Sequence, residues 1–281
     1  LMISIGKYYK LFEVKSLSQN SPLPKAPSSL EKYSYVQRHV NYLTIFSVIG
    51  FVSLTVSTTK LYLERAWLYP LFFLLGYTVF YFIVSLRINL FPEDFDLKRH
   101  QQLVKGWSPD NYPSVDIFLP NCGEPIDVLA NTWDGIIRMQ SRYPGLLNIY
   151  CLDDAHNYKV KFLANGYGFH YFARPNKGWF KKAGNLRHGF ENSSGDFIAI
   201  FDADFRPRSD FLNELLPYFY NDSKLGIVQS PQYFAVSDKQ NWLERGAGAV
   251  QEFFYRAIQV SRQTHGGAIC VGSNAIYRRR A

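Results

Sequence analysis

Two long stretches without a charged side chain lie near the start of the 281-residue chain. The first runs from Val40 to Thr59 and the second from Ala66 to Leu86. Each is about 20 residues long, and an α-helix of that length crosses the roughly 30 Å hydrocarbon core of a bilayer. The sequence therefore predicts two transmembrane helices, at about 40–59 and 66–86. A buried core helix is the alternative for the first stretch, which is richer in Ser and Thr.

Basic residues flank this predicted hairpin on both outer sides. Residues 1–40 hold six Lys or Arg against two Glu, and four further basic residues follow within 87–105. The link between the spans carries only Lys60 and Arg65 as basic residues. Because Lys and Arg near membrane spans stay on the cytoplasmic side, we expect an integral plasma-membrane protein with both ends in the cytoplasm. Residues 1–38 are predicted to be a basic flexible tail.

The net charge of +8 is concentrated in the N-terminal third of the chain. Residues 91–281 carry 22 basic and 20 acidic side chains, so this part is almost balanced. No basic face for nucleic acid is implied. Aromatic residues make up 17% of the chain, which excludes a disordered protein, and three cysteines are too few for a disulfide scaffold.

Strand and helix patterns alternate after residues 91–113, which are expected to be a linker. The apolar segments Val115–Leu119, Leu146–Leu152 and Phe197–Phe201 are typical of buried strands, with helical patterns between them. This alternation predicts an α/β fold with a mostly parallel sheet covered on both faces. Ligands of such sheets bind beyond the carboxyl ends of the strands. The residues that directly follow these segments are therefore the candidates for chemistry.

Two pairs of carboxylates stand at such strand ends. Asp202 and Asp204 follow the most apolar strand, and residues two apart in an extended segment point the same way. A cation between them would relieve their repulsion, and oxygen ligands suit Mg²⁺ or Mn²⁺. Such an ion also binds phosphate oxygens. The pattern therefore favours a site for a nucleoside diphosphate derivative over carboxylates that merely belong to a loop. Asp153 and Asp154 either cap the next helix or accept hydrogen bonds from a base or ribose.

A lysine-rich turn lies between these pairs. This turn contains Lys177, Lys181 and Lys182. The lysines are either part of a solvated loop or contacts for a diphosphate, because the point charge of a lysine ammonium suits that ligand. The sequence holds no GxGxxG after a strand, no GxxxxGK[ST] and no HExxH. A dinucleotide oxidoreductase, a P-loop ATPase and a zinc protease are therefore disfavoured.

Six short segments, in this order, resemble the inverting family 2 glycosyltransferases, and more narrowly their processive, membrane-embedded cellulose synthase type. They are VDIFLPNCGEP, LDD, KKAGN, FDADF, VQSPQYF and CVGSNAIYRRRA. The resemblance covers about residues 114–281. It implies a GT-A (Rossmann-like) glycosyltransferase domain, preceded by the transmembrane hairpin, that uses a UDP-sugar, most often UDP-glucose.

The resemblance also implies roles for individual residues. The positions matching the family's nucleotide-binding residues are Asn121, Glu124, Asp153, Asp154, Lys182 and Asp202. Metal binding is implied for Asp202 and Asp204, as the family's DxD motif. Gly272 and Ser273 match the acceptor-side loop near the growing chain end.

The implied reaction is a one-step displacement that moves a sugar from a UDP-sugar onto a growing β-linked polysaccharide. Mg²⁺ or Mn²⁺ would neutralise the departing UDP. The family's general base, in a TED motif, and its QxxRW motif both follow the RRRA segment, and neither occurs in this sequence. The domain is therefore expected to be C-terminally incomplete, with its catalytic base beyond Ala281, so that it binds a UDP-sugar without elongating a polymer.

The expected partners are the UDP-sugar donor, the polysaccharide acceptor and the lipid bilayer, with no nucleic acid. Accessory subunits or a homo-oligomer are compatible with the resemblance. Two alternatives remain: a non-processive family 2 transferase that acts on a lipid carrier, and a catalytically inactive membrane protein that binds nucleotide sugars. QxxRW in the full-length sequence would exclude the first, and absence of a base there would favour the second.

Overall fold

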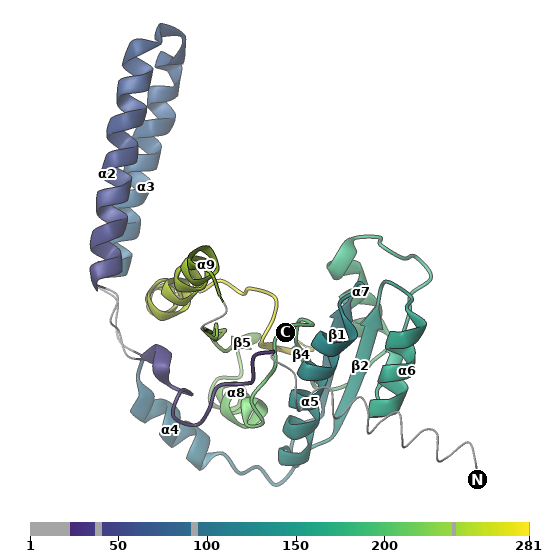
Figure 1. The fold of residues 1–281 in the computed structure, drawn as a ribbon. Helices are drawn as coiled ribbons and strands as arrows, with labels where there is room; N and C mark the ends of the chain where they lie inside the picture. The colour runs from purple at the N-terminus through teal and green to yellow at the C-terminus, as the bar shows by residue number, and fades with distance from the viewer. Residues whose placement is uncertain (1–22, 37–40, 91–94, 238–239, 281) are drawn as a thin grey trace, which may run out of the picture. The chain divides into compact units, whose positions relative to one another are not determined.

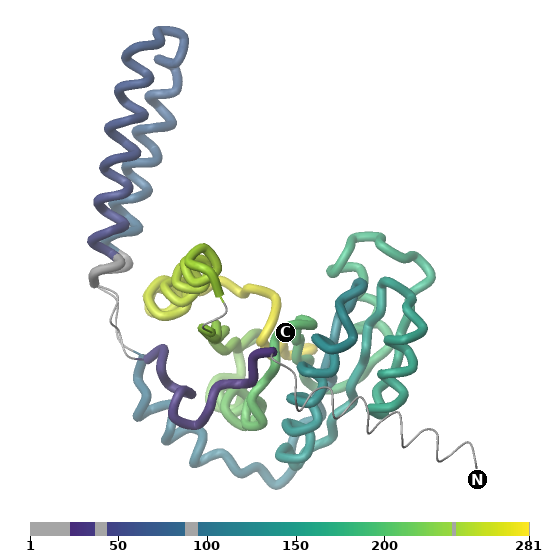
Figure 2. The backbone as a smooth tube through the Cα atoms, viewed as in Figure 1, coloured from purple at the N-terminus to yellow at the C-terminus, as the bar shows by residue number. Residues whose placement is uncertain are grey.

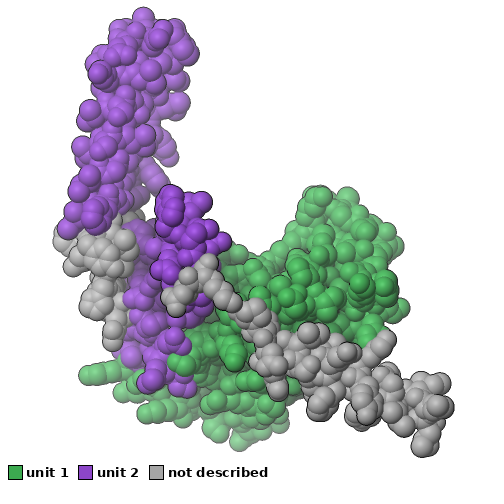
Figure 3. Space-filling view, viewed as in Figure 1, with its two compact units in different colours: residues 1–28, 98–232, 270–281 green, residues 29–97, 233–269 purple. Residues whose placement is uncertain are grey.

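The computed structural model describes residues 23–36, 41–90, 95–237 and 240–280. The chain forms two compact units, shown in different colours in Figure 3. Unit 1 comprises residues 1–28, 98–232 and 270–281, and unit 2 comprises residues 29–97 and 233–269. Each unit is described by itself below.

Unit 1 is built on a six-stranded sheet with the strand order β3-β2-β1-β4-β6-β5. The strands are β1 (Val115–Asn121), β2 (Leu147–Asp153), β3 (His170–Phe172), β4 (Phe197–Ile200), β5 (Ile227–Gln229) and β6 (Ala275–Arg278). The first four pair in parallel, whereas β6 runs antiparallel to both β4 and β5. The predicted α/β class, with a mostly parallel sheet, is confirmed.

Helices cover both faces of this sheet (Figure 1). They are α5 (Ile126–Arg142), α6 (Tyr158–Tyr167), α7 (Lys181–Glu191) and α8 (Phe211–Asn221). Alternate residues of β1 serve two separate cores. Ile117 packs in the cluster that holds Trp133 of α5 and Leu212 of α8. Phe118 packs in a second cluster, against which Leu186 of α7 lies. Burial on both faces explains why the strands are apolar without alternation.

Two segments expected to be irregular are in fact ordered parts of unit 1. The predicted linker contains α4 (Leu97–Gly106), and the imidazole of its buried His100 lies 2.7 Å from both the Tyr218 hydroxyl and Glu214 Oε2. Part of the predicted flexible tail is also bonded to the domain, because Asn131 Nδ2 donates to the Pro24 carbonyl over 2.9 Å. Residues 1–22 and 37–38 of that tail lie outside the described residues.

Unit 2 holds the apolar hairpin. Its helices α2 (Asn41–Glu64) and α3 (Phe72–Leu90) run side by side (Figures 1 and 2), and the rings of Phe51 and Phe82 stack with centroids 3.7 Å apart. Residues 44–64 and 66–87 are long and apolar enough to cross a membrane, and only 6% of each span is buried. These two helices indicate membrane association.

The hairpin turns later than the charge pattern suggested. The helix continues through the predicted link as far as Glu64, and the chain turns at Arg65, whose backbone is extended. The 3-10 helix η2 (Ala66–Leu71) then leads into α3. A single charge such as Lys60 does not end a helix, because a straight-chain lysine is a good helix former.

Unit 2 also contains a continuous helical stretch made of three consecutive pieces. These are α9 (Trp242–Phe253), the π-helical turn η3 (Phe254–Ile258) and α10 (Gln259–Thr264). Asn241 and Glu244 form a capping box at the start of α9: the Asn241 side chain accepts from the Glu244 N–H over 3.0 Å, and Glu244 Oε2 accepts from the Asn241 N–H over 2.9 Å. This cap accounts for the observed start of the helix.

Candidate functional site

The site is built at the carboxyl ends of β1, β2 and β4, where the sequence predicted it. Asn121, the last residue of β1, lies in register with Asp153, the last residue of β2. The Asn121 side-chain amide donates to Asp153 Oδ1 over 2.8 Å. Two of the predicted nucleotide-binding residues are therefore joined directly across the sheet.

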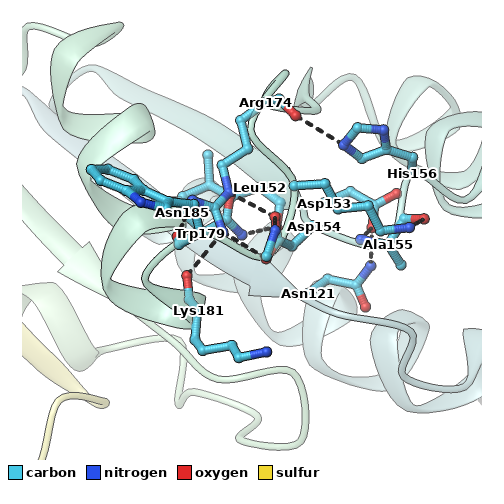
Figure 4. A network of polar contacts seen from close by, with 12 residues as sticks. Asn121, Leu152, Asp153, Asp154, Ala155, His156, Arg174, Trp179, Lys181 and Asn185 are labelled. Carbon is cyan, nitrogen blue, oxygen red and sulfur yellow. Dashed lines mark hydrogen bonds and ion pairs between the residues drawn. The ribbon is translucent and has the colours of Figure 1, made fainter.

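Asp153 is fully buried and holds this strand end together (Figure 4). Besides Asn121, its carboxylate accepts from the backbone N–H groups of Ala155 and Asn157, over 2.9 and 2.7 Å, and from the Tyr171 hydroxyl over 2.8 Å. Burial, and then the bond to this carboxylate, raise the pKa of Tyr171. With four donors already bonded, Asp153 serves to fix the loop before α6. Its contact with a base stays a prediction.

Asp154 forms a buried ion pair that the sequence analysis did not find. Arg174, which is fully buried, donates from Nε and Nη2 to the two Asp154 oxygens over 2.7 and 2.8 Å. The Gly178 N–H also donates to Asp154, over 3.2 Å. The hydrogen bonds from Arg174 hold the pKa of Asp154 below its ordinary value, which keeps this carboxylate ionised. A direct role in binding a nucleotide stays a prediction for Asp154.

Glu124 closes a tight loop directly after β1. Its carboxylate accepts from the Cys122 N–H over 2.6 Å, and the Asn121 side chain accepts from the N–H groups of Gly123 and Glu124, each over 3.3 Å. Gly123 has a φ of 106°, a conformation that only glycine adopts readily. The predicted pair Asn121 and Glu124 therefore shares one ordered loop at the sheet edge.

Three separate segments meet around Asp202, just after β4. The Lys182 ammonium, from the first turn of α7, forms an ion pair with the Asp202 carboxylate and donates to the Gly272 carbonyl over 3.2 Å. The Asp202 N–H donates to the Ser273 hydroxyl over 3.0 Å. The structure thus brings together the predicted diphosphate lysine, the first predicted metal ligand and the predicted acceptor-side loop.

The predicted metal pair has a different backbone from the one assumed. The strand ends at Ile200, and the Phe205 N–H donates to the Asp202 carbonyl over 3.2 Å, so the segment forms a turn and is not extended. Asp202 is half-buried and Asp204 is exposed. Within the described part of the chain, no group of three or more His, Cys, Asp or Glu side chains is placed to hold a metal ion.

Gly184 and Arg174 shape the lysine turn, and sequence reasoning gave no role to Arg174. A Cβ on Gly184 would lie 2.1 Å from the Trp179 carbonyl oxygen and 2.4 Å from Arg174 Nη1, so only glycine fits there. This close approach explains the glycine of the KKAGN segment. Arg174 itself lies just after β3, and a position beyond a strand end was the available signal.

An α/β sheet with carboxylate pairs and a lysine gathered at its strand ends is the arrangement of a GT-A glycosyltransferase domain. Comparison with known sequences identifies the family: the profile of "Glycosyl transferase family 2" matches residues 116–281. The chain belongs to this family, as its motifs predicted.

Its similar relatives include several bacterial cellulose synthases. The chain is 33% identical over 177 residues to the cellulose synthase 1 catalytic subunit (UDP-forming) of Komagataeibacter xylinus, covering 62% of this chain and 24% of the relative. For the corresponding subunit of Xanthomonas axonopodis pv. citri the identity is 32% over 174 residues, covering 60% and 24%. The chain therefore spans about a quarter of the length of these relatives.

Solved structures with a similar course of the backbone are glycosyltransferases too, at low similarity. Mannosyl-3-phosphoglycerate synthase from Rubrobacter xylanophilus matches with a TM-score of 0.42 and 16% identity, over 66% of this chain and 57% of that one. Glucosyl-3-phosphoglycerate synthase from Mycobacterium tuberculosis, in complex with Mn²⁺, UDP and glucosyl-3-phosphoglycerate, matches with a TM-score of 0.40 and 17% identity, over 68% and 63%.

Proposed function

We propose that the family 2 domain of this chain binds a UDP-sugar, with UDP-glucose as the first candidate, and transfers the sugar to a growing β-linked polysaccharide. Family membership supports glycosyl transfer, and the similarity to cellulose synthase catalytic subunits supports the donor and the acceptor. We assign the donor side of this reaction to described residues of unit 1. The proposal assigns no general base among them.

One observation supports the proposal more than any other: the meeting of Lys182, Asp202 and the Gly272–Ser273 loop at one sheet edge. A diphosphate needs positive charge, and Lys182 supplies it from the first turn of a helix. Gly272, which is half-buried and has a φ of 80°, accepts a hydrogen bond from the same lysine. A sugar attached to the diphosphate would therefore lie beside this loop, where an acceptor hydroxyl can approach it.

We infer a divalent cation, Mg²⁺ or Mn²⁺, at Asp202 and Asp204, because such ions prefer carboxylate oxygens. Two carboxylates are too few for a closed protein cage, which agrees with an ion that keeps waters and takes further oxygens from a diphosphate. Asp202 and Asp204 would hold it, and it would stabilise the charge of the departing UDP. When no metal ion is bound, Lys182 balances the charge of Asp202. When the ion is bound, the lysine can turn to the phosphates instead.

The membrane part of the proposal rests on the apolar helices α2 and α3. We place both in the bilayer and the glycosyltransferase domain on the cytoplasmic side, because basic residues flank the hairpin outside the link. This orientation puts the domain where nucleotide sugars are made. Accessory subunits and self-association are left open.

The test is calorimetric titration of UDP into the chain in lipid nanodiscs, with Mn²⁺ and with EDTA. We expect binding that Mn²⁺ strengthens, and an Asp204→Asn variant that no longer responds to Mn²⁺. Asp222→Asn, which changes an exposed carboxylate at the end of α8, is the control and should respond as the wild type does. Equal affinity in Mn²⁺ and EDTA for all three proteins would refute the proposed metal site.

A further inference from the structure

We propose that Arg174 is a positioning residue that aims Lys182 at the diphosphate of the donor. This inference rests on the proposed function and adds a residue that acts through another one. Asp154 enters it as the partner that holds Arg174 in place. Arg174 would act by shaping the lysine turn, because no bond joins it to Lys182 itself.

The guanidinium of Arg174 is bonded along its whole edge (Figure 4). Nε and Nη2 donate to Asp154, Nη1 donates to the Trp179 carbonyl, and Nη2 also donates to the Lys181 carbonyl over 3.2 Å. The planar fork of arginine can bond both oxygens of a carboxylate and two carbonyls at once, and a lysine ammonium has only three donors for these four bonds. Arg174 thereby connects the end of β2 to the start of α7.

The two carbonyls that Arg174 contacts, those of Trp179 and Lys181, lie at the two ends of a backbone segment with positive φ values. Phe180 and Lys181 have φ values of 51° and 48°, in the left-handed region that side chains other than glycine rarely adopt. Such a conformation persists only where the surroundings impose it. Bonds from one buried guanidinium to the residues at both ends of this piece are such a constraint.

The constrained backbone leads directly into the lysine. The Gly184 N–H donates to the Phe180 carbonyl over 3.1 Å, so the first turn of α7 begins at these left-handed residues. Lys182 is the second residue of that helix, and its ammonium reaches Asp202 and Gly272. A change in the Phe180–Lys181 backbone would turn the helix start and move this ammonium away from the strand end.

A substitution at Gly184 tests the contact between Arg174 and the lysine turn in a second way. A methyl group at this position would meet the Trp179 carbonyl and Arg174 Nη1, both far inside normal contact distance. Gly184→Ala therefore pushes the turn away from Arg174 without removing a charge. Arg174→Lys instead keeps the charge beside Asp154 and removes the fork.

Both variants should weaken UDP binding about 10- to 100-fold, the loss expected when a charge-assisted bond to phosphate is misaligned. Binding of uridine, which has no phosphate, should stay within about twofold. We would measure UDP by calorimetry in Mn²⁺ and uridine by saturation-transfer NMR, on the whole chain in nanodiscs. Using two variants keeps the test open if one of them fails to fold, which a thermal melt would reveal.

Arg279→Lys is a matched control. Arg279 also pairs with a buried carboxylate, Asp116, over 2.8 Å, and also donates to two backbone carbonyls, those of Gly195 and Phe190. Its partners lie at the amino end of β4 and the end of α7, away from Lys182. This variant should lower thermal stability and leave UDP affinity unchanged. Gly246→Ala, at a site with open space, is the control for the glycine change.

A double-mutant cycle with Lys182→Met then separates positioning from a general structural effect. If Arg174 acts through Lys182, Arg174→Lys should cost less than about twofold in UDP affinity once Lys182 is gone. Loss by the same factor in both backgrounds, or an equal loss for uridine, would overturn the inference and leave the proposed function intact. A wild-type chain that binds no UDP would overturn both.

Discussion

Replacing Lys182 with Met should change metal binding and nucleotide binding in opposite directions. Lys182 neutralises Asp202 in the structure described here, and a divalent cation at Asp202 and Asp204 would compete with that ammonium. Methionine keeps much of the length of the side chain but carries no charge. The variant should therefore bind Mn²⁺ alone more tightly, and UDP in the presence of Mn²⁺ more weakly.

The two effects differ in size because the two interactions differ in exposure. The Lys182 and Asp202 side chains are 41% and 34% exposed, so their ion pair is screened by solvent and is worth about 0.2–1 kcal/mol. Its removal should tighten Mn²⁺ binding by roughly 1.4- to 5-fold. A charged contact to a diphosphate is worth about 1.5–3 kcal/mol, so UDP should bind about 10- to 100-fold more weakly.

Both affinities can be measured on one preparation. The free Mn²⁺ concentration is read from its paramagnetic resonance signal during a titration without nucleotide, and UDP is titrated by calorimetry at saturating Mn²⁺. Lys224→Met removes an exposed lysine just after α8 and is the control, with neither value expected to move. Weaker Mn²⁺ binding in Lys182→Met would refute the reasoning, because it would show that the lysine supports the ion instead of competing with it.

Three further predictions concern stability and topology. Because Arg174 lowers the pKa of Asp154, this carboxylate stabilises the fold fully above its ordinary pKa of 3.8 and loses that effect as the pH falls through the lowered value. Asp154→Asn should thus melt below the wild type at pH 7, and the gap should narrow as the pH falls below 3.8. Arg279→Gln leaves the buried Asp116 carboxylate unpaired and should cost about 3–5 kcal/mol in chemical denaturation, with UDP affinity unchanged. In sealed vesicles with the cytoplasmic face outward, protease should digest the C-terminal domain and spare a tag inserted at residues 60–65; the reverse pattern would refute the orientation.

Local periodicity carried enough information to predict most of the elements. The runs around Val115–Leu119 and Phe197–Phe201 are strands in the structure, and the residues after them do gather at one sheet edge. This works because a strand buried on both faces must be apolar throughout, and because parallel strands bring their carboxyl ends to the same side. The uncharged spans likewise predicted two long apolar helices, since length and hydropathy are properties of the sequence itself.

Tertiary structure alone decided how the site is divided between its residues. Asp153 and Asp154 are neighbours in the sequence, yet one fixes the loop before α6 and the other holds Arg174. The need for glycine at position 184 also appears only when Trp179 and Arg174 are packed against it. These contacts join residues from separate strands, helices and turns, and a carboxylate's partners depend on which donors the fold brings within bonding distance. No local pattern in the sequence encodes that distance.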